Sequence, residues 1–276
     1  MEHTESRFRG IGGLELYAQS WRPDGRPRAA LAILHGHGEH SGRYGNVFEY
    51  FTPRGYALHA FDLRGHGRSL GQRGHIRDWS DYRNDTRAFL GFVSEREPGL
   101  PLFLYGHSLG GLIVLDYGLH HTEGLKGAIV TGPVLGPPQI PAILLALSKA
   151  LSRAWPTLSM NSGLDPSAIS RDPVVVKAYV EDPLVHSKGT PRLGAEMLRT
   201  AEWAQEHAAD WRLPLLIVHG GDDHLSPSAF SRQFFEKLTI PDKRRIEIPG
   251  GFHEPHNDLA KAAVFADIER WLEAHL

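Results

Sequence analysis

Six short apolar runs alternate with longer amphipathic segments along most of the chain, and this alternation limits the fold more than any other feature. The runs, most of them bounded by Gly, Pro or Asp, lie at 30–35, 56–61, 102–105, 126–131, 215–219 and 245–248. Continuous apolar runs suit strands that are covered on both faces, as in a parallel sheet. The segments with helical spacing include 78–97, 109–121, 227–237 and 258–276. The alternation therefore predicts an α/β fold, with a mostly parallel central sheet flanked by helices.

One strand pair is expected before this alternation begins, and one long interval interrupts it. Residues 13–20 and their neighbours predict a leading antiparallel pair. From about residue 132 to 212 no strong strand run occurs, and prolines, short helical patterns and several aromatic residues take its place. An insertion of this length between core strands predicts a helical cap over the sheet. We therefore divide the chain into a core of residues 1–132 and 213–276 and a cap insertion of residues 133–212.

The first part of the expected cap has apolar residues at helical spacing. They are Ile140, Ile143, Leu144, Leu147 and Leu151. Such spacing places them on one face of an amphipathic helix. The pattern leaves two interpretations open: a helix that packs on the core, or an exposed apolar lid that touches lipid as an interfacial helix does.

Composition and charge exclude several classes of protein. The chain is 41% hydrophobic and 22% charged, which is ordinary for a globular protein. Its formal net charge of −2 gives no electrostatic reason to expect a nucleic acid as partner. The chain has no cysteine, which excludes disulfides, thiolate metal sites and cysteine nucleophiles.

Neither a secretory signal nor a membrane-spanning helix is expected. The first residues, Met1-Glu2-His3-Thr4-Glu5, contain no basic segment that leads into an apolar one. The longest uncharged stretch, 127–148, is interrupted by Pro133, Pro137, Pro138 and Pro141. Prolines at this density forbid a continuous spanning helix. We expect a cytoplasmic protein that at most rests on a membrane surface.

The sequence Gly106-His107-Ser108-Leu109-Gly110 matches the G-x-S-x-G pattern of a nucleophile turn. A strand-like run precedes it and a helical pattern follows it at once. Such a sharp turn strains the backbone at the serine and leaves no room for side chains two residues away, so glycine is needed on both sides. The serine hydroxyl is then lifted above the sheet, where the N-terminus of the next helix stabilises a developing oxyanion. The alternative is an ordinary glycine-rich turn between a strand and a helix.

Two later strand ends carry the acid and the base that a serine nucleophile needs. Asp222 and Asp223 follow the fifth apolar run in a Gly-Gly-Asp-Asp sequence, and His253 follows the sixth after Pro-Gly-Gly-Phe. This order of Ser, Asp and His is that of serine hydrolases with the α/β-hydrolase fold, and open α/β sheets bind ligands at strand ends of this kind. We assign His253 as the base ahead of His256, which lies nearer the last helix. Spacing alone does not decide between Asp222 and Asp223.

A histidine-rich loop, His35-Gly36-His37-Gly38-Glu39-His40, follows the first apolar run. It resembles the H-x-H-x-D-H pattern of metallo-β-lactamase-type hydrolases, which bind two metals. The acidic position here is Glu, and the serine-hydrolase triad is already complete. His107 would also have to belong both to the metal site and to the nucleophile turn, so we expect no metal. In a serine hydrolase, the same turn lets the backbone N–H of His37 join that of Leu109 in an oxyanion hole.

Several blocks of the sequence resemble the monoacylglycerol lipases, which are also described as lysophospholipases. The blocks are residues 35–44, 62–69, 106–111, 168–184 and 220–225, so the resemblance spans nearly the whole chain. The blocks at 35–44 and 168–184 are much more specific than the G-x-S-x-G pattern.

The resemblance implies roles for further residues. The family places its acid at the fourth position of G-x-x-D, which falls on Asp223, and its base on His253. It also implies that Glu39, Arg43 and Tyr179 hold the polar head of the substrate, although Glu39 and Arg43 would serve equally well as a structural pair. The family fold implies a cap whose apolar face meets a membrane and whose tunnel takes the acyl chain. It needs no metal and no organic cofactor.

The sequence departs from the family pattern at His37, where a small or aliphatic residue is more usual. Catalysis should survive, because the oxyanion donor at this position is the backbone. An imidazole in the pocket wall suggests an altered head-group preference or pH response.

We therefore expect a serine hydrolase that cleaves monoacylglycerols to fatty acid and glycerol through an acyl-enzyme on Ser108. A general carboxylesterase or lysophospholipase would use the same chemistry, and a small-molecule binder that retains the fold is an alternative from another class. The expected partners are the lipid substrate and, through the cap, a membrane surface in transient contact. The sequence leaves the oligomeric state open.

Overall fold

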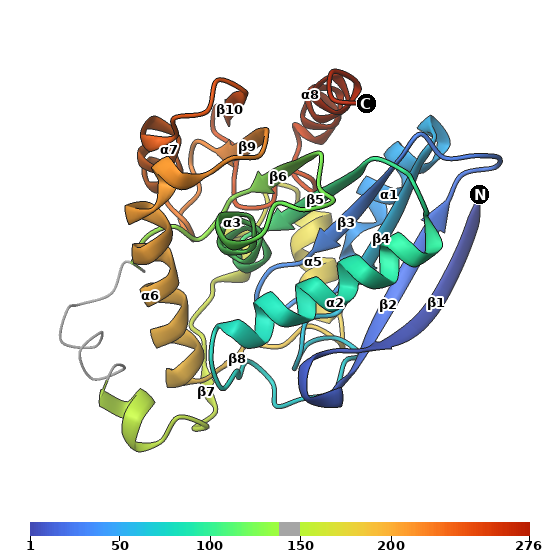
Figure 1. Ribbon diagram of the computed structural model, residues 1–276. Helices are drawn as coiled ribbons and strands as arrows, with labels where there is room; N and C mark the ends of the chain where they lie inside the picture. Colours follow the sequence, from blue (N-terminus) through green and yellow to red (C-terminus); the bar gives the residue numbers. More distant parts are fainter. Residues whose placement is uncertain (138–149) are drawn as a thin grey trace.

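The computed structural model describes residues 1–137 and 150–276, and an eight-stranded sheet forms its centre (Figure 1). The strand order is β1-β2-β4-β3-β5-β6-β9-β10. The strands are β1 (Glu2–Arg9), β2 (Glu15–Arg22), β3 (Ala29–Leu34), β4 (Tyr56–Phe61), β5 (Leu102–His107), β6 (Gly127–Thr131), β9 (Leu215–Gly220) and β10 (Lys243–Ile248). From β4 to β10 all neighbouring strands are parallel, whereas β1 and β2 are antiparallel additions at one edge. The predicted α/β fold with a mostly parallel sheet is confirmed.

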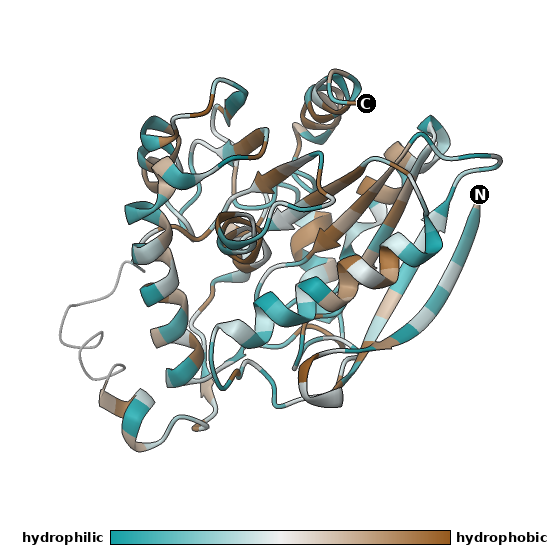
Figure 2. Cartoon of the chain, viewed as in Figure 1, coloured by the Kyte–Doolittle hydropathy of each residue, from teal (hydrophilic) through white to brown (hydrophobic). Residues whose placement is uncertain are grey.

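Helices cover both faces of this sheet. They are α1 (Gly45–Phe51), α2 (Ser80–Arg96), α3 (Leu109–His120), α7 (Ser228–Lys237) and α8 (Lys261–Glu273). Along β3, Ala30, Ala32 and Leu34 belong to the apolar cluster that includes α2 and α3, and the alternate residues belong to the cluster that includes α1 and α8. This is why the strand sequences are continuously apolar: both faces are buried. Figure 2 shows the apolar colour along the central strands and a polar β1 at the edge.

The predicted elements agree with the observed ones to within a few residues at most ends. Strand β4 has the predicted bounds, and the leading antiparallel pair is present as β1 and β2, although β1 begins earlier than expected. Helix α1 was not predicted, because its seven residues make too short a segment for helical spacing to stand out.

The segment expected to form the cap contains α5 (Pro173–Glu181), α6 (Pro191–Glu206) and a small sheet of β7 (Met160–Asn161) with β8 (Lys188–Gly189). Helix α6 contacts α3 and α7, and its Leu193, Ala201 and Ala204 belong to the same buried cluster as α3. This part of the segment is therefore packed directly on the core. The division into core and cap stays a prediction.

The apolar stripe expected at the start of the cap falls largely outside the described residues. Of its members, only Leu151 is described, and it is half-buried in a helical stretch at 150–154. Among the helices that the structure describes, none combines the length and the apolar character needed to cross a membrane.

Candidate active site

Ser108 lies at the sharp turn between β5 and α3. Its φ of 52° and ψ of −114° place it in a region that L-residues rarely adopt. The flanking glycines are required by close packing: a Cβ on Gly106 would lie 2.3 Å from the carbonyl oxygen of Gly110, and a Cβ on Gly110 would lie 2.2 Å from that of Leu34. The backbone N–H of Ser108 donates to the carbonyl of Thr131 at 2.9 Å, which ties the turn to β6. The turn thus has the geometry expected of the G-x-S-x-G pattern.

His253 connects Ser108 to an aspartate through two short hydrogen bonds. Its Nε2 lies 2.8 Å from Ser108 Oγ, and its Nδ1 lies 2.7 Å from Asp223 Oδ2. All three residues are buried, whereas Asp222 is exposed. Of the two aspartates between which the residue pattern left the choice open, the structure places Asp223 against His253. The arrangement is the one expected of a nucleophile, a base and an acid for acyl transfer.

The other contacts of Asp223 keep it ionised. Its Oδ1 accepts the backbone N–H groups of Leu225 and Ser226 at 2.9 Å each, and its Oδ2 also lies 3.1 Å from His219 Nε2. Burial alone raises the pKa of this carboxyl, but the charge of His253 and the hydrogen bonds from both histidines outweigh it, so the pKa lies well below its ordinary value. A carboxylate in this state orients the imidazole of His253 and stabilises its protonated form.

The charge balance around His253 favours a proton. Burial lowers the pKa of the imidazole, yet the Asp223 carboxylate, its hydrogen bond and the charges of Glu254 and Glu39 together raise it above the ordinary value. His253 is thus a stronger base than a free imidazole, which suits the transfer of a proton from Ser108.

Two backbone amides lie where an oxyanion hole is expected. Leu109 is the first residue of α3, and His37 follows Gly36 in the loop after β3. A Cβ on Gly36 would lie only 3.2 Å from the Cβ of Ser108, so this loop runs directly against the nucleophile. Within the part of the chain that the structure describes, no hydrogen bond takes up the N–H of His37 or Leu109. Both donors are therefore free to bind a developing negative charge.

The remaining side chains of the histidine-rich loop do not converge on one point. His35 bonds to the carbonyl of Gly36 through Nδ1 at 2.7 Å and accepts the N–H of Leu63 through Nε2 at 2.8 Å. His40 Nε2 lies 2.9 Å from Asp182 Oδ2 in the segment expected to form the cap. In residues 1–137 and 150–276 no three His, Cys, Asp or Glu side chains are arranged to hold a metal ion.

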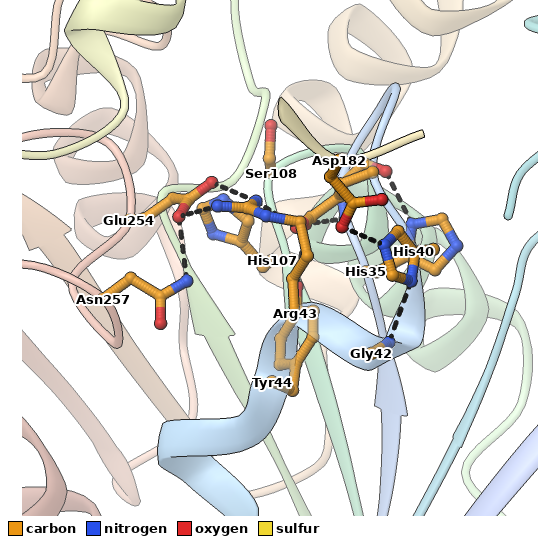
Figure 3. Close-up of polar contacts among 12 residues, drawn as sticks. His35, His40, Gly42, Arg43, Tyr44, His107, Ser108, Asp182, Glu254 and Asn257 are labelled. Atoms are coloured by element: carbon orange, nitrogen blue, oxygen red, sulfur yellow. Dashed lines mark hydrogen bonds and ion pairs between the residues drawn. The ribbon is translucent and has the colours of Figure 1, made fainter. Parts of the chain in front are cut away.

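The three residues with an implied head-group role lie together, but two of them bind each other. Arg43 Nη1 donates to Glu39 Oε2 at 2.6 Å, and its guanidinium carbon lies 4.6 Å from the centre of the Tyr179 ring. Arg43 also makes a two-pronged contact with Glu254, at 2.6 and 2.9 Å, which is drawn in Figure 3. The alternative of a structural pair therefore fits Glu39 and Arg43.

Sequence reasoning missed Glu254 and His107. Glu254 directly follows the expected base, His253, and an acidic residue in that position was a signal that went unused. His107 is buried with its ring centre 4.8 Å from that of His253 and its Nδ1 3.0 Å from the carbonyl of Thr131. The G-x-S-x-G pattern allows any residue at the position before the serine, so nothing in the sequence singled out His107.

A small cavity opens beside the histidine-rich loop of residues 35–40, which we call the oxyanion loop because it contains the expected oxyanion donor, the N–H of His37. Its volume is about 220 Å³, and its lining includes His37, Tyr179, Asp182 and His186. Apolar residues contribute to the lining as well, among them Leu164, Val180 and Val185, and the cavity lies between the loop after β3 and the segment that contains α5 and β8.

The sheet topology and this site together define a class of protein, the serine hydrolases of the α/β-hydrolase fold. Residues 25–260 match the hydrolase family described as serine aminopeptidase, S33.

Individual relatives specify the family further. The chain is 35% identical over 275 residues to a monoacylglycerol lipase of Mycolicibacterium smegmatis, covering 99% of this chain and 98% of the relative. It is 28% identical to the monoglyceride lipase of Homo sapiens, covering 94% and 87%. A crystal structure of Paleococcus ferrophilus monoacylglycerol lipase matches with a TM-score of 0.84 at 34% identity over the full length of both chains. The chain belongs to the monoacylglycerol lipase family.

Proposed function

We propose that the protein is a serine hydrolase that cleaves monoacylglycerols to a fatty acid and glycerol. The observation that carries the chemistry is the continuous pair of hydrogen bonds from Ser108 Oγ through His253 to Asp223, at 2.8 and 2.7 Å, beside two free backbone amides. The substrate class is supported by the names of relatives of nearly equal length.

Acylation begins when Ser108 Oγ attacks the ester carbonyl and its proton passes to His253 Nε2. The carbonyl oxygen becomes an oxyanion, which the N–H groups of His37 and Leu109 bind. The C–O bond to glycerol then breaks, and His253 returns its proton to the leaving oxygen, so that glycerol departs and an acyl ester remains on Ser108.

Deacylation repeats these steps with water. His253 takes a proton from a water molecule, whose oxygen attacks the acyl-enzyme, and the second oxyanion occupies the same two amides. Collapse of this intermediate returns the proton to Ser108 Oγ and releases the fatty acid.

A head-group role is best supported for Tyr179 and His37. Both line the cavity of about 220 Å³, which is small in comparison with a typical pocket for a drug-sized ligand and suits a compact group. A role of Glu39 and Arg43 in binding the head group directly stays a prediction, since their charged atoms are already paired with each other or with Glu254.

Transient membrane contact also stays a proposal, together with a cytoplasmic location. Trp155, Met160, Val174 and Val180, all in the segment expected to form the cap, are 58%, 47%, 72% and 64% exposed. Exposed apolar side chains of this size suit the headgroup region of a bilayer. Co-sedimentation with phosphatidylcholine vesicles tests this contact, and retention of all protein in the supernatant would remove it.

Hydrolysis of a substrate panel tests the proposed function. The panel contains monoacylglycerols of graded chain length, di- and triacylglycerols, a lysophosphatidylcholine, a p-nitrophenyl ester and an aminoacyl anilide for the peptidase activity in the family description. We expect the largest kcat/KM with a monoacylglycerol. A preference for triacylglycerol or lysophospholipid would contradict the substrate class, and turnover of the anilide alone would contradict the ester chemistry.

A further inference from the structure

A triplet of buried charges lies beneath the active site, and we call it the clamp: Glu39, Arg43 and Glu254. Their side chains are only 3%, 8% and 3% exposed. Arg43 Nη1 contacts both Glu39 Oε2 and Glu254 Oε1 at 2.6 Å, and Nη2 contacts Glu254 Oε2 at 2.9 Å. Three buried charges contribute little net stability, because desolvation offsets much of their attraction. The role of these charges is therefore better explained by the two loops that they connect than by stability.

One end of the clamp holds the oxyanion loop. Glu39 Oε1 accepts the backbone N–H of Gly36 at 2.6 Å and the hydroxyl of Tyr44 at 3.0 Å. Gly36 directly precedes His37, the residue whose amide is the expected oxyanion donor. With Arg43 on its other oxygen, Glu39 has donors on both sides, so its orientation and that of the Gly36–His37 peptide are set together.

The other end holds the loop of the base. Glu254 directly follows His253, and besides Arg43 its carboxylate accepts Asn257 Nδ2 at 2.9 Å. Its backbone N–H donates to the carbonyl of Ile169 at 2.8 Å. Both the main chain and the side chain of Glu254 are thus anchored, and Figure 3 shows the side-chain contacts with Arg43 and Asn257. These contacts fix the backbone from which the imidazole of His253 projects.

We propose that Arg43 is a positioning residue, which holds the oxyanion loop and the base loop at a fixed separation by binding Glu39 and Glu254 at once. This inference rests on the proposed function, since the two loops matter together only if Ser108 performs acyl transfer. It assigns Arg43 an action through other residues instead of contact with the substrate.

The surroundings of Arg43 support this role over head-group binding. Both Nη atoms point at carboxylates, and the Tyr179 ring covers the guanidinium from the side of α5 at 4.6 Å. The lining of the neighbouring cavity includes Tyr179 but not Arg43. A guanidinium enclosed in this way has no free fork to offer to a glycerol hydroxyl.

The two carboxyl groups of the clamp also act on the base. Glu254 and Glu39 both raise the pKa of His253, in addition to the larger effect of Asp223. The other titratable groups beside the clamp and the base are His107 and His256, whose pKa values burial lowers, and Tyr44 and Tyr179, whose pKa values burial raises. The clamp therefore favours the imidazolium that forms when Ser108 is deprotonated.

The Arg43→Lys variant tests the proposal, because an ammonium keeps the charge but cannot bridge two carboxylates as a guanidinium does. Rates are measured with a monoacylglycerol and with a p-nitrophenyl ester of the same fatty acid, which has no glycerol group. We expect kcat to fall by about 10- to 100-fold with both esters, the size of effect that a small misplacement of catalytic groups produces. We expect KM to change by less than about threefold.

Three kinetic outcomes would overturn the proposal. An increase in KM confined to the monoacylglycerol, with kcat retained, would show that Arg43 binds the head group. Unchanged kinetics with both esters would show that the clamp positions nothing. Arg83→Lys is the matched control, since Arg83 also makes a two-pronged contact, at 2.8 and 2.7 Å, with a buried carboxylate, that of Asp116, two turns along α3 from Ser108. An equal loss in this control would reduce the effect to general destabilisation and would also overturn the proposal.

Hydrogen exchange gives a readout that does not depend on activity. We expect the backbone amide of Gly36 to exchange at least about tenfold faster in Arg43→Lys than in the wild type or in Arg83→Lys, because this N–H loses its oriented acceptor, Glu39. Equal exchange in all three proteins would overturn the proposal. A wild type that cleaves neither ester would contradict the proposed function, while the exchange experiment would still test the clamp.

Glu254→Gln replaces Arg43→Lys if that variant does not fold. Glutamine keeps the shape and removes one charge, so we expect a lower kcat with both esters and an acid limb of kcat/KM at lower pH than in the wild type. Retention of both the rate and the pH profile would overturn the proposal.

Discussion

His253 and a separate cluster of three histidines, His37, His66 and His186, have imidazole pKa values shifted in opposite directions. His253 contacts a carboxylate, and its pKa is raised despite burial. In this cluster the ring centres lie 4.8 to 5.8 Å apart, and burial lowers the pKa values of His37 and His186 to about 4 and lowers that of His66 as well. The same residue type thus favours the protonated imidazolium in one region and the neutral imidazole in the other. The difference lies in the carboxylate partner, because burial alone disfavours the charged form.

We expect the largest effect from Asp223→Asn, because it removes the carboxylate that distinguishes His253 from the cluster of neutral histidines. Without the carboxylate, His253 should resemble the other buried histidines, with a lower pKa and an unfixed tautomer. We expect kcat to fall by about 10⁴-fold, as when the orienting acid of a Ser-His-Asp triad is replaced by its amide. Steady-state hydrolysis of a p-nitrophenyl ester measures the loss. The exposed neighbour provides the control, Asp222→Asn, which should retain wild-type rates; the reverse pattern would reassign the acid.

The pH dependence of kcat/KM in the wild type tests whether the pKa of His253 is raised. His253 must be neutral to accept the proton of Ser108, so activity is lost as the pH falls through its pKa in the free enzyme. Because that pKa is raised, the acid limb should have its midpoint above about 6.5, the ordinary value for an imidazole. A midpoint near pH 5 would show that the pKa of His253 is lowered, as in the neutral histidines, and would contradict the account.

The cluster of neutral histidines, His37, His66 and His186, should make the stability of the fold sensitive to acid. Its folded-state pKa values lie below the unfolded value of about 6.5, so between about pH 4 and 6.5 the unfolded chain binds protons that the folded chain does not. Stability is therefore full above this window and falls as the pH decreases through it. A buried histidine of this kind contributes at most about 1.4 kcal/mol per pH unit, and the partly exposed His186 contributes less. We expect the Tm to fall by about 5 °C per unit below pH 6.

His66→Asn tests which histidines are responsible. The asparagine amide can replace His66 Nδ1 as donor to the carbonyl of Arg64, which lies 3.0 Å away, but it does not titrate in this range. Thermal unfolding between pH 7.5 and 4.5 should show a shallower decrease of Tm in this variant than in the wild type. The same substitution at the exposed His3 is the control, and equal slopes in all three proteins would remove the explanation.

The smallest effect is expected at His37. Its imidazole stays neutral above about pH 5 and its contribution to the oxyanion hole is the backbone N–H, so His37→Ala should keep kcat to within about threefold. The shape of the pH profile between pH 6 and 9 should also be unchanged. A displaced acid limb would show that His37 titrates in the working range, against the contrast between the two regions.

The sequence predicted the fold and the main candidate residues because they depend on local patterns. Continuous apolar runs indicate strands that are buried on both faces, and the carboxyl ends of parallel strands meet at one edge. Ser108, Asp223 and His253 therefore converge even though they lie far apart in the chain. Family resemblance added the choice of Asp223 over Asp222, which periodicity could not make because side-chain direction at a turn depends on its dihedral angles.

The clamp could not be predicted in the same way. The pairing of Arg43 with Glu39, four residues away, was considered, but Glu254 is 211 residues away from Arg43, and no spacing rule connects them. Which of two plausible roles a buried arginine has, binding substrate or binding its neighbours, depends on where its guanidinium points. The same holds for the two groups of histidines, since residue type does not show which imidazole meets a carboxylate.

Fluorophosphonate labelling followed by mass mapping of the modified peptide tests the central claim, that Ser108 is a nucleophile activated by His253 and Asp223. The account predicts one adduct per chain on Ser108, slower labelling of Asp223→Asn and no labelling of Ser108→Ala. An adduct on another residue, or a folded wild-type protein that is not labelled, would contradict it.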